Sequence, residues 1–137
     1  MQFATIQPTA SRPDLPAITD EEAAALARAT VNLFRAWQLS DIEARTLLGD
    51  MTQRTWARWK DGSIGRIDRD LRARMGILMG IHKALRYLFT DPARGYAWIK
   101  KPNGAFAGQA ALDVMKRGEI TDLIDLRSYL DAERGGW

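Results

Sequence analysis

The residues of this sequence best suited to chemistry are basic side chains gathered in one short segment. Residues 51–67 contain four cations and a single anion, namely Arg54, Arg58, Lys60, Arg66 and Asp61. Arginine can form paired hydrogen bonds to the edge of guanine, and glutamine such as Gln53 can do the same to adenine, while any cation can bind a phosphate. The segment therefore indicates contact with DNA, although a solvated helix face often carries similar charges.

Two short predicted helices would position these side chains. Ser40 and Glu43 have the spacing of a capping box, so the first helix begins there and ends at Gly49. Thr52 is a good N-cap for the second helix, which stops at Asp61-Gly62. On the first helix we expect four buried side chains, which are Ile42, Ala44, Leu47 and Leu48.

With the turn Gly49-Asp50-Met51 between them, these helices have the proportions of a helix-turn-helix, whose second helix enters the major groove of DNA. Its small core would consist of Leu48, Met51, Trp56 and Trp59. We expect Gln53 and Arg54, in the first turn, to meet base edges, and the later cations to bind phosphates. The predicted DNA-binding residues are Gln53, Arg54, Ala57, Arg58, Lys60 and Arg66.

The segment before this motif is predicted to contain a tail and one helix. Residues 1–17 contain three prolines and no apolar period, which predicts a flexible N-terminal tail. Thr19 and Glu22 repeat the capping-box spacing at the start of a helix that reaches Trp37. The DNA-binding domain would therefore span residues 18–66.

A long helix would follow, capped by Asp68, and would begin a helical domain over residues 67–137. Its apolar residues cover nearly the whole circumference, which predicts burial on several sides. Gly76 and Gly80 lie four residues apart and would allow close approach of another backbone. His82 falls on the apolar stripe, so we interpret it as a core residue without a chemical role.

Three further helices are expected after Asp91-Pro92, with an ordered loop over residues 100–108 in which Phe106 fills an apolar gap. The whole fold is therefore predicted to be all-α. Residues 113–137 carry more anions than cations, the opposite of residues 51–67. This asymmetry indicates that the two ends of the protein face different partners.

Composition excludes several classes of protein. The 137 residues include no cysteine and one histidine, so we expect neither a disulfide nor a metal centre. No Ser/His/Asp or Cys/His pairing and no phosphate-binding glycine loop is present, which predicts a protein that is not an enzyme and needs no cofactor. With no apolar run long enough for a bilayer and no signal pattern, we expect no membrane contact and a cytoplasmic location.

The last forty residues carry a set of types and spacings that is more specific than these patterns. The set runs from Trp98 to the end of the chain and consists of Pro102-Asn103, Phe106, Ala111-Leu112-Asp113-Val114-Met115, Gly118, Arg127, Tyr129-Leu130-Asp131 and Arg134-Gly135-Gly136-Trp137. It resembles the toxin-binding domain of the Xre/MbcA/ParS antitoxins. The helix-turn-helix and long helix resemble the N-terminal part of that family, so the resemblance covers nearly everything after residue 18.

The resemblance implies a type II toxin–antitoxin pair. The partner would be a RES-domain toxin that consumes or transfers the ADP-ribose of NAD, and this chain would block it and repress its own operon as a dimer or higher complex on operator DNA. The implied toxin-binding residues are Phe106, Arg127, Tyr129, Asp131, Arg134, Gly135, Gly136 and Trp137. Trp137 would be an aromatic anchor, unless it folds back onto its own core. The alternative is a helix-turn-helix transcription regulator whose C-terminal domain dimerises or binds a ligand, with no toxin.

Overall fold

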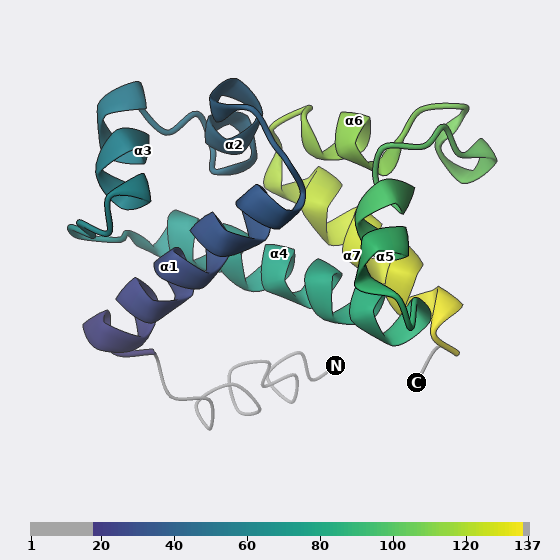
Figure 1. Ribbon diagram of the computed structural model, residues 1–137, viewed down its shortest axis with the longest axis horizontal. Helices are drawn as coiled ribbons and strands as arrows, with labels where there is room; N and C mark the ends of the chain where they lie inside the picture. Colours follow the sequence, from purple (N-terminus) through teal and green to yellow (C-terminus); the bar gives the residue numbers. More distant parts are fainter. Residues whose placement is uncertain (1–17, 136–137) are drawn as a thin grey trace, which may run out of the picture.

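The computed structural model describes residues 18–135, and it contains helices and no strand in that range (Figure 1). The elements are α1 (Asp20–Ala36), α2 (Asp41–Leu47), α3 (Gln53–Lys60), α4 (Arg69–Leu88), α5 (Pro92–Trp98), the 3-10 turn η3 (Gly104–Phe106), α6 (Ala111–Met115) and α7 (Ile120–Glu133). The predicted all-α fold is confirmed. The predicted tail over residues 1–17 and the terminal Gly136 and Trp137 lie outside the described residues. No described helix is long and apolar enough to cross a membrane.

Side-chain caps determine where the first four helices begin. The capping residues are Thr19, Ser40, Thr52 and Asp68, and each accepts a hydrogen bond from the N–H three residues further on. Glu22 and Glu43 bond back to the cap backbone and complete two capping boxes. Each cap satisfies an amide that the helix cannot pair and contributes about 1 kcal/mol. The four predicted helix starts are therefore confirmed.

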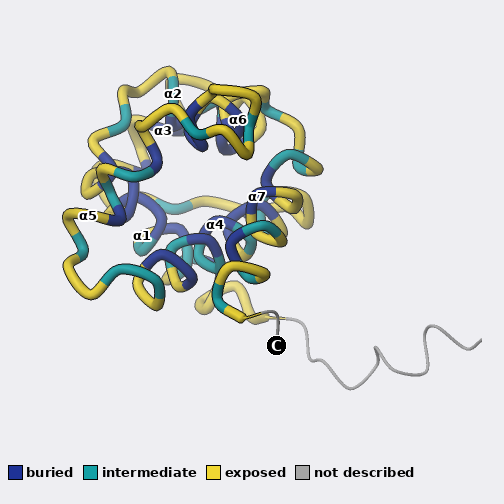
Figure 2. Tube along the Cα trace, turned by 90° about the vertical axis from the view of Figure 1, so that its right-hand side faces the viewer, coloured by how far each residue is buried: buried dark blue, intermediate teal, exposed yellow. Residues whose placement is uncertain are grey.

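Helix α4 forms the centre of the fold, and α1, α5 and α7 all pack against it (Figure 1). Buried segments of α1, α4 and α7 gather in the middle of the molecule (Figure 2). The large apolar side chains of α4 that are fully buried are Met75, Leu78, Ile81 and Leu85. Full burial of such a side chain stabilises the fold by roughly 1.5–3 kcal/mol. The prediction that α4 is covered on several sides is confirmed.

Neither of the two glycines predicted to permit close approach of another backbone has one beside it. A Cβ added at Gly80 would lie 2.5 Å from Cζ of Arg127, so a side chain of α7 occupies the space that this glycine leaves open. Gly76 has no atom within 4 Å of such a Cβ. The prediction for Gly76 is therefore wrong, because this residue lies on an exposed side of α4 that no neighbouring helix covers.

The prediction that Ile42 is buried is also wrong, since this side chain is 72% exposed. The other three residues of the predicted set, Ala44, Leu47 and Leu48, are all buried. A helix turns by about 100° per residue, which places Ile42 on the opposite side of α2 from those three residues. The prediction rested on the apolar character of Ile42, but its position on the helix directs the side chain to solvent.

A buried arginine joins the two halves of the molecule. Arg74 of α4 is 8% exposed, and its Nε donates to Asp70 Oδ2 at 2.9 Å while its Nη1 donates to the carbonyl of Gly118 at 2.9 Å. On its other side lies Gly49, where an added Cβ would be 2.9 Å from Arg74 Nε. One guanidinium thus contacts both the turn before α3 and the turn before α7.

Candidate functional site

The turn between α2 and α3 contains two residues with positive φ. Gly49 has φ of 78° and Asp50 has φ of 64°, and aspartate is one of the few other residues that enter this region at modest cost. Arg45 closes the turn from both directions. Its carbonyl accepts a hydrogen bond from the N–H of Met51 at 3.1 Å, and its Nε donates to the carbonyl of Met51 at 2.7 Å. The start of α3 is therefore tied to α2.

The inner face of α3 is held by its two tryptophans. Trp56 and Trp59 are 4% and 3% exposed, and with Leu48 and Met51 they form the predicted core, which is confirmed. The Trp56 ring lies 6.0 Å from that of Phe34 on α1, and its Nε1 donates to Asp41 Oδ1 at 2.9 Å. These contacts lock the rotation of α3 about its axis and determine which residues face outward.

The outer face of α3 carries the residues predicted to contact DNA. The side chains of Gln53, Arg54, Ala57 and Arg58 are exposed. Among the described residues, the guanidinium groups of Arg54 and Arg58 have no hydrogen-bond or ion-pair partner. Two cations one helical turn apart are thus free to meet an anionic ligand such as the phosphodiester backbone.

Lys60 differs from these two arginines because a carboxylate of the same chain holds it. Its Nζ lies 3.0 Å and 3.1 Å from the two carboxylate oxygens of Asp41 on α2. The hydrogen bond from Trp56 and then that from Lys60 lower the pKa of Asp41, so this carboxylate stays charged at neutral pH. Any phosphate bound by Lys60 would compete with Asp41.

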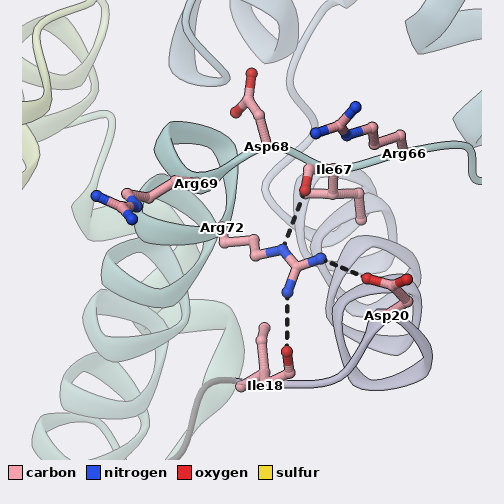
Figure 3. A pocket seen from close by; sticks show the side chains of 7 residues that line it. All are labelled: Ile18, Asp20, Arg66, Ile67, Asp68, Arg69 and Arg72. Carbon is pink, nitrogen blue, oxygen red and sulfur yellow. Dashed lines mark hydrogen bonds and ion pairs between the residues drawn. The ribbon is translucent and has the colours of Figure 1, made fainter. Parts of the chain in front are cut away.

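Arg66 lies beyond α3, in the segment that leads into α4, and it is exposed (Figure 3). Beside it, the guanidinium of Arg72 turns inward and donates to the carbonyls of Ile67 and Ile18 and to the carboxylate of Asp20. Figure 3 shows Arg66 directed away from this cluster. The structure therefore leaves the Arg66 cation accessible but places it outside the face of α3.

The implied toxin-binding residues fall into two groups on opposite flanks of α7. On one flank, the Tyr129 ring is 5.1 Å from that of Phe106, which is 6.2 Å from that of Trp98, and both pairs meet edge to face. Phe106 thus anchors the loop over residues 100–108 to α7 and α5, as predicted. The other flank carries Arg127 and Asp131.

In this second group, Asp131 is 3.7 Å from Arg127 Nε and 3.7 Å from Arg134 Nη1. Arg134 also lies over the ring of Tyr87, with Cζ 4.5 Å from the centroid, which is a cation–π contact. Gly135 follows and is exposed. The structure brings Arg127, Asp131 and Arg134 together. Gly136 and Trp137 lie outside the described residues.

Three residues that fix the position of α3 and of the turn before it were not predicted from the sequence. Asp41 contacts α3 through Trp56 and Lys60, and Arg45 closes the turn before α3. Arg74 contacts the turn at Gly49 and the turn at Gly118. Arg45 and Arg74 each have a partner close in the chain, at Met51 and Asp70 respectively. A short-range signal could have identified those two contacts, but not the contacts of Asp41 or the hydrogen bond from Arg74 to Gly118.

The described residues contain no group of three or more His, Cys, Asp or Glu side chains that could hold a metal ion. His82 is partly buried on α4, and this burial, followed by the charge of Arg86, lowers the pKa of its imidazole.

Comparison with known proteins covers most of the chain. Residues 16–80 match the family model described as the antitoxin Xre-like helix-turn-helix domain. Residues 84–136 match the one described as the antitoxin Xre/MbcA/ParS C-terminal toxin-binding domain. The uncharacterized protein y4oB of Sinorhizobium fredii (strain NBRC 101917 / NGR234) is 41% identical over 100 residues, which are 73% of this chain and 77% of that protein.

Proposed function

Because this chain belongs to the Xre/MbcA/ParS family of antitoxins, we propose that it neutralises a RES-domain toxin, an enzyme that consumes or transfers the ADP-ribose of NAD. We also propose that this chain represses its own operon by binding operator DNA, as a homodimer or in a larger complex with the toxin. Residues 18–66 would bind DNA and residues 67–137 the toxin. An operator and an NAD-consuming enzyme both imply action in the cytoplasm.

The observation that supports DNA binding is the outer face of α3. Arg54 and Arg58 are exposed there without a partner among the described residues, while Trp56 and Trp59 anchor the opposite face. An anchored helix with free cations on its outer face meets the geometric needs of a recognition helix in the major groove. We propose that Gln53 and Arg54 read bases and that Arg58, Lys60 and Arg66 bind phosphates, with Ala57 against the bases.

Toxin binding is proposed for the two flanks of α7 and the end of the chain. Phe106 and Tyr129 would contribute from one flank, and Arg127, Asp131 and Arg134 from the other. The segment Gly135-Gly136-Trp137 would follow as an extension with an aromatic anchor, and buried aromatic anchors commonly dominate the binding energy of an interface.

The test is co-expression of this chain with the protein encoded beside it in the same operon. We expect the two proteins to purify together, the complex to protect cellular NAD, and the antitoxin alone to bind a fragment of its own promoter. An adjacent protein that neither binds nor depletes NAD would refute the toxin assignment. Retained promoter binding would then favour the transcription regulator without a toxin.

Deletion of residues 135–137 tests the anchor separately. Because α7 ends at Glu133, the truncation removes no part of a helix, and the shortened chain should fold and bind the promoter as before. Neutralisation should fail or weaken strongly, measured as growth and NAD level of cells that express the toxin. Full protection by the truncated chain would show that the helical surface alone blocks the toxin.

A further inference from the structure

A groove lies between α1 and α5, with α4 as its floor. It consists of two adjoining depressions of ≈ 330 Å³ and ≈ 400 Å³, which share Ala36 and Tyr96. Both α1 and α5 pack against α4 and lie on the same side of it (Figure 2). The apolar lining also includes Leu33 of α1, Met79 of α4 and Ala93 of α5. We call this surface the α1–α5 groove.

The walls of the groove are made of small side chains. Ala29 and Ala36 line it from α1, and Ala93 and Ala97 line it from α5. Three of these four alanines are exposed, since Ala29 alone is half-buried. Small side chains on both walls let the backbone of another helix come close. Along α1 the alanines span roughly 10 Å, so the groove is long enough for about two turns of an incoming helix.

Two polar atoms of the lining residues are buried without a partner. Trp37 is 1% exposed, and its indole Nε1 makes no hydrogen bond within the described residues. The imidazole Nδ1 of His82 is in the same situation. Buried polar atoms are paired in most folded proteins. The groove therefore has hydrogen-bonding capacity that the described part of the chain does not use.

The segments that form the groove are almost free of acidic residues. Residues 23–40 contain none, and between residues 71 and 112 the only one is Asp91. Asp91 caps α5, because its Oδ1 accepts a hydrogen bond from the N–H of Ala93 at 3.1 Å. The same two stretches contain two and seven basic residues, respectively. The electrostatic potential around the groove is therefore positive.

Three of these cations stand at the groove itself. Lys100 lines it and donates to a backbone carbonyl just beyond α1 at 3.4 Å. Lys83 lies one helical turn after the lining residue Met79. Arg86 lies one turn after His82, so both cations share a face of α4 with the lining. Lys83 and Arg86 are exposed, and neither forms a hydrogen bond or an ion pair with the described residues.

We propose that the α1–α5 groove binds an acidic amphipathic helix of a partner protein. The apolar face of that helix would lie between the alanine walls, and its carboxylates would meet Lys83, Arg86 and Lys100. Helices dock into grooves in this way through apolar side chains that recur every three or four residues. Burial of the apolar face supplies affinity, and the cationic rim speeds association and disfavours basic partners. The groove shares no residue with the sets proposed for DNA or for the toxin, so this binding goes beyond both functions.

Other occupants fit the groove less well. Residues 1–17 contain one anion, Asp14, and one cation, Arg12, so this segment does not complement the rim. Nucleic acid would pair with the cations, but interfaces with nucleic acid are predominantly polar, whereas alanines, Leu33 and Met79 dominate this lining. An acidic amphipathic helix matches both the lining and the rim.

The experiment titrates the full-length chain with a labelled synthetic helical peptide of about 15 residues. The peptide carries leucine and alanine on one face and glutamate on the other, and fluorescence anisotropy gives the Kd. We expect it to bind, and to bind more weakly as the salt concentration rises. A counterpart with lysine in place of glutamate and a scrambled peptide of the same composition should each bind at least about tenfold more weakly. No binding of the acidic peptide, or equal binding of either control peptide, would overturn the proposal.

Ala36→Glu tests the location, because Ala36 is exposed where the two depressions meet. The substitution should raise the Kd of the acidic peptide on the order of 100-fold, since it places a carboxylate in the path of the helix. The matched control is Ala73→Glu, at an exposed alanine of α4 outside the groove, and it should leave the Kd unchanged. Thermal unfolding reports whether each variant is folded. An unchanged Kd for Ala36→Glu would show that the peptide binds elsewhere.

Arg86→Glu tests the rim. It should raise the Kd about tenfold at low salt and less at high salt, because it replaces an attraction with a repulsion. Arg69→Glu makes the same charge change at an exposed residue at the other end of α4 and should have a clearly smaller effect. An equal effect of the two would remove Arg86 from the site.

Two further outcomes would replace the proposed occupant with another. If the acidic peptide does not bind and Arg86→Glu weakens binding to DNA of random sequence, the rim is a nucleic-acid contact. If the free chain associates with itself, no peptide competes and Ala36→Glu abolishes the association, the occupant is a second copy of the chain. Measurement of DNA affinity and of the mass of the free chain distinguishes these outcomes, and either one overturns the proposal.

Discussion

The guanidinium of Arg127 lies so close to Gly80 that a Cβ added at residue 80 would be 2.5 Å from its Cζ. The two residues belong to α7 and α4, which pack along each other. Glycine inside a helix lowers stability by roughly 0.5–1 kcal/mol relative to alanine. Position 80 thus accepts a less favourable helix residue and leaves room for Arg127 beside Asp131.

Alanine at the two glycines of α4 should have different effects. Gly76→Ala should raise the free energy of unfolding by roughly 0.5–1 kcal/mol, because nothing lies near the new methyl group. Gly80→Ala has the same helix preference but displaces Arg127 from Asp131, so we expect a clearly smaller gain or none. Urea unfolding of both variants measures this. In an Arg127→Ala background the two should stabilise equally, and equal gains in the wild-type background would contradict the close approach.

Two arginines of α3 should affect DNA binding in different ways. Arg54→Ala should weaken operator binding by roughly 1–3 kcal/mol and relax sequence preference, because it removes the proposed base contact. Arg58→Ala should weaken binding to all sequences alike and reduce its salt dependence, since it removes the proposed phosphate contact. Titration of operator and unrelated DNA at several salt concentrations separates the two effects. Unchanged binding by both variants would remove α3 from the interface.

Trp56→Ala should destabilise the N-terminal half. The indole is 4% exposed and packs against Phe34, so truncation leaves a cavity and costs roughly 3–5 kcal/mol. It also removes the hydrogen bond to Asp41. Arg54→Ala, on the exposed face of the same helix, is the control and should unfold like the wild type. Thermal unfolding of the pair provides the measurement, and an unaltered Trp56→Ala transition would mean that the phase of α3 is wrong.

Acid should weaken the contact between α2 and α3. The pKa of Asp41 is lowered from 3.8 by Trp56 and then Lys60, so its contribution to stability is complete above that value and is lost as the pH falls through the lower, folded-state pKa. The difference in stability between wild type and Asp41→Asn should therefore be constant near neutrality and shrink below about pH 4. Unfolding midpoints across this range measure it. A difference that does not change with pH would contradict the role of the carboxylate charge.

Arg74→Met should cost roughly 1–3 kcal/mol of stability, because it leaves the carbonyl of Gly118 without its donor. It should also weaken operator binding, since the guanidinium supports the turn at Gly49. Arg69→Met, an exposed change on the same helix, is the control and should shift stability by less than about 0.5 kcal/mol. Denaturant unfolding and operator titration of both variants test this. Equal behaviour of the two would show that Arg74 does not join the halves.

The features that could be predicted from sequence are those decided within a few residues. The caps at Ser40 and Thr52 follow from contacts three positions away. The outward direction of Arg54 follows from the helical spacing of Trp56 and Trp59, which are buried on the opposite face of α3. Ile42 was misplaced because α2 is only two turns long and its apolar side chain outweighed its position on the helix.

The features that could not be predicted depend on pairs far apart in the chain. Lys60 meets Asp41 across 19 positions, and Arg74 meets Gly118 across 44. The nearby sequence offers Arg74 an ion pair with Asp70, but it does not predict that Arg74 is buried, because the burial depends on turns that are distant in the chain, at Gly49 and Gly118. Such contacts form only when the other helices pack around α4.

The contact of the Arg74 guanidinium with two turns limits which parts of this chain can be exchanged independently. Because Arg74 serves the turn at Gly49 and the turn at Gly118, the two halves are not interchangeable modules on a common linker. A chimera that joins one half of this chain to the other half of a related protein must keep Gly49, Gly118 and Arg74 in the same relative positions. Otherwise the exchange also disturbs the half that was not replaced. Substitutions on the exposed face of α3 leave the contacts of Arg74 unchanged, whereas exchange of the whole C-terminal half removes its hydrogen bond to Gly118.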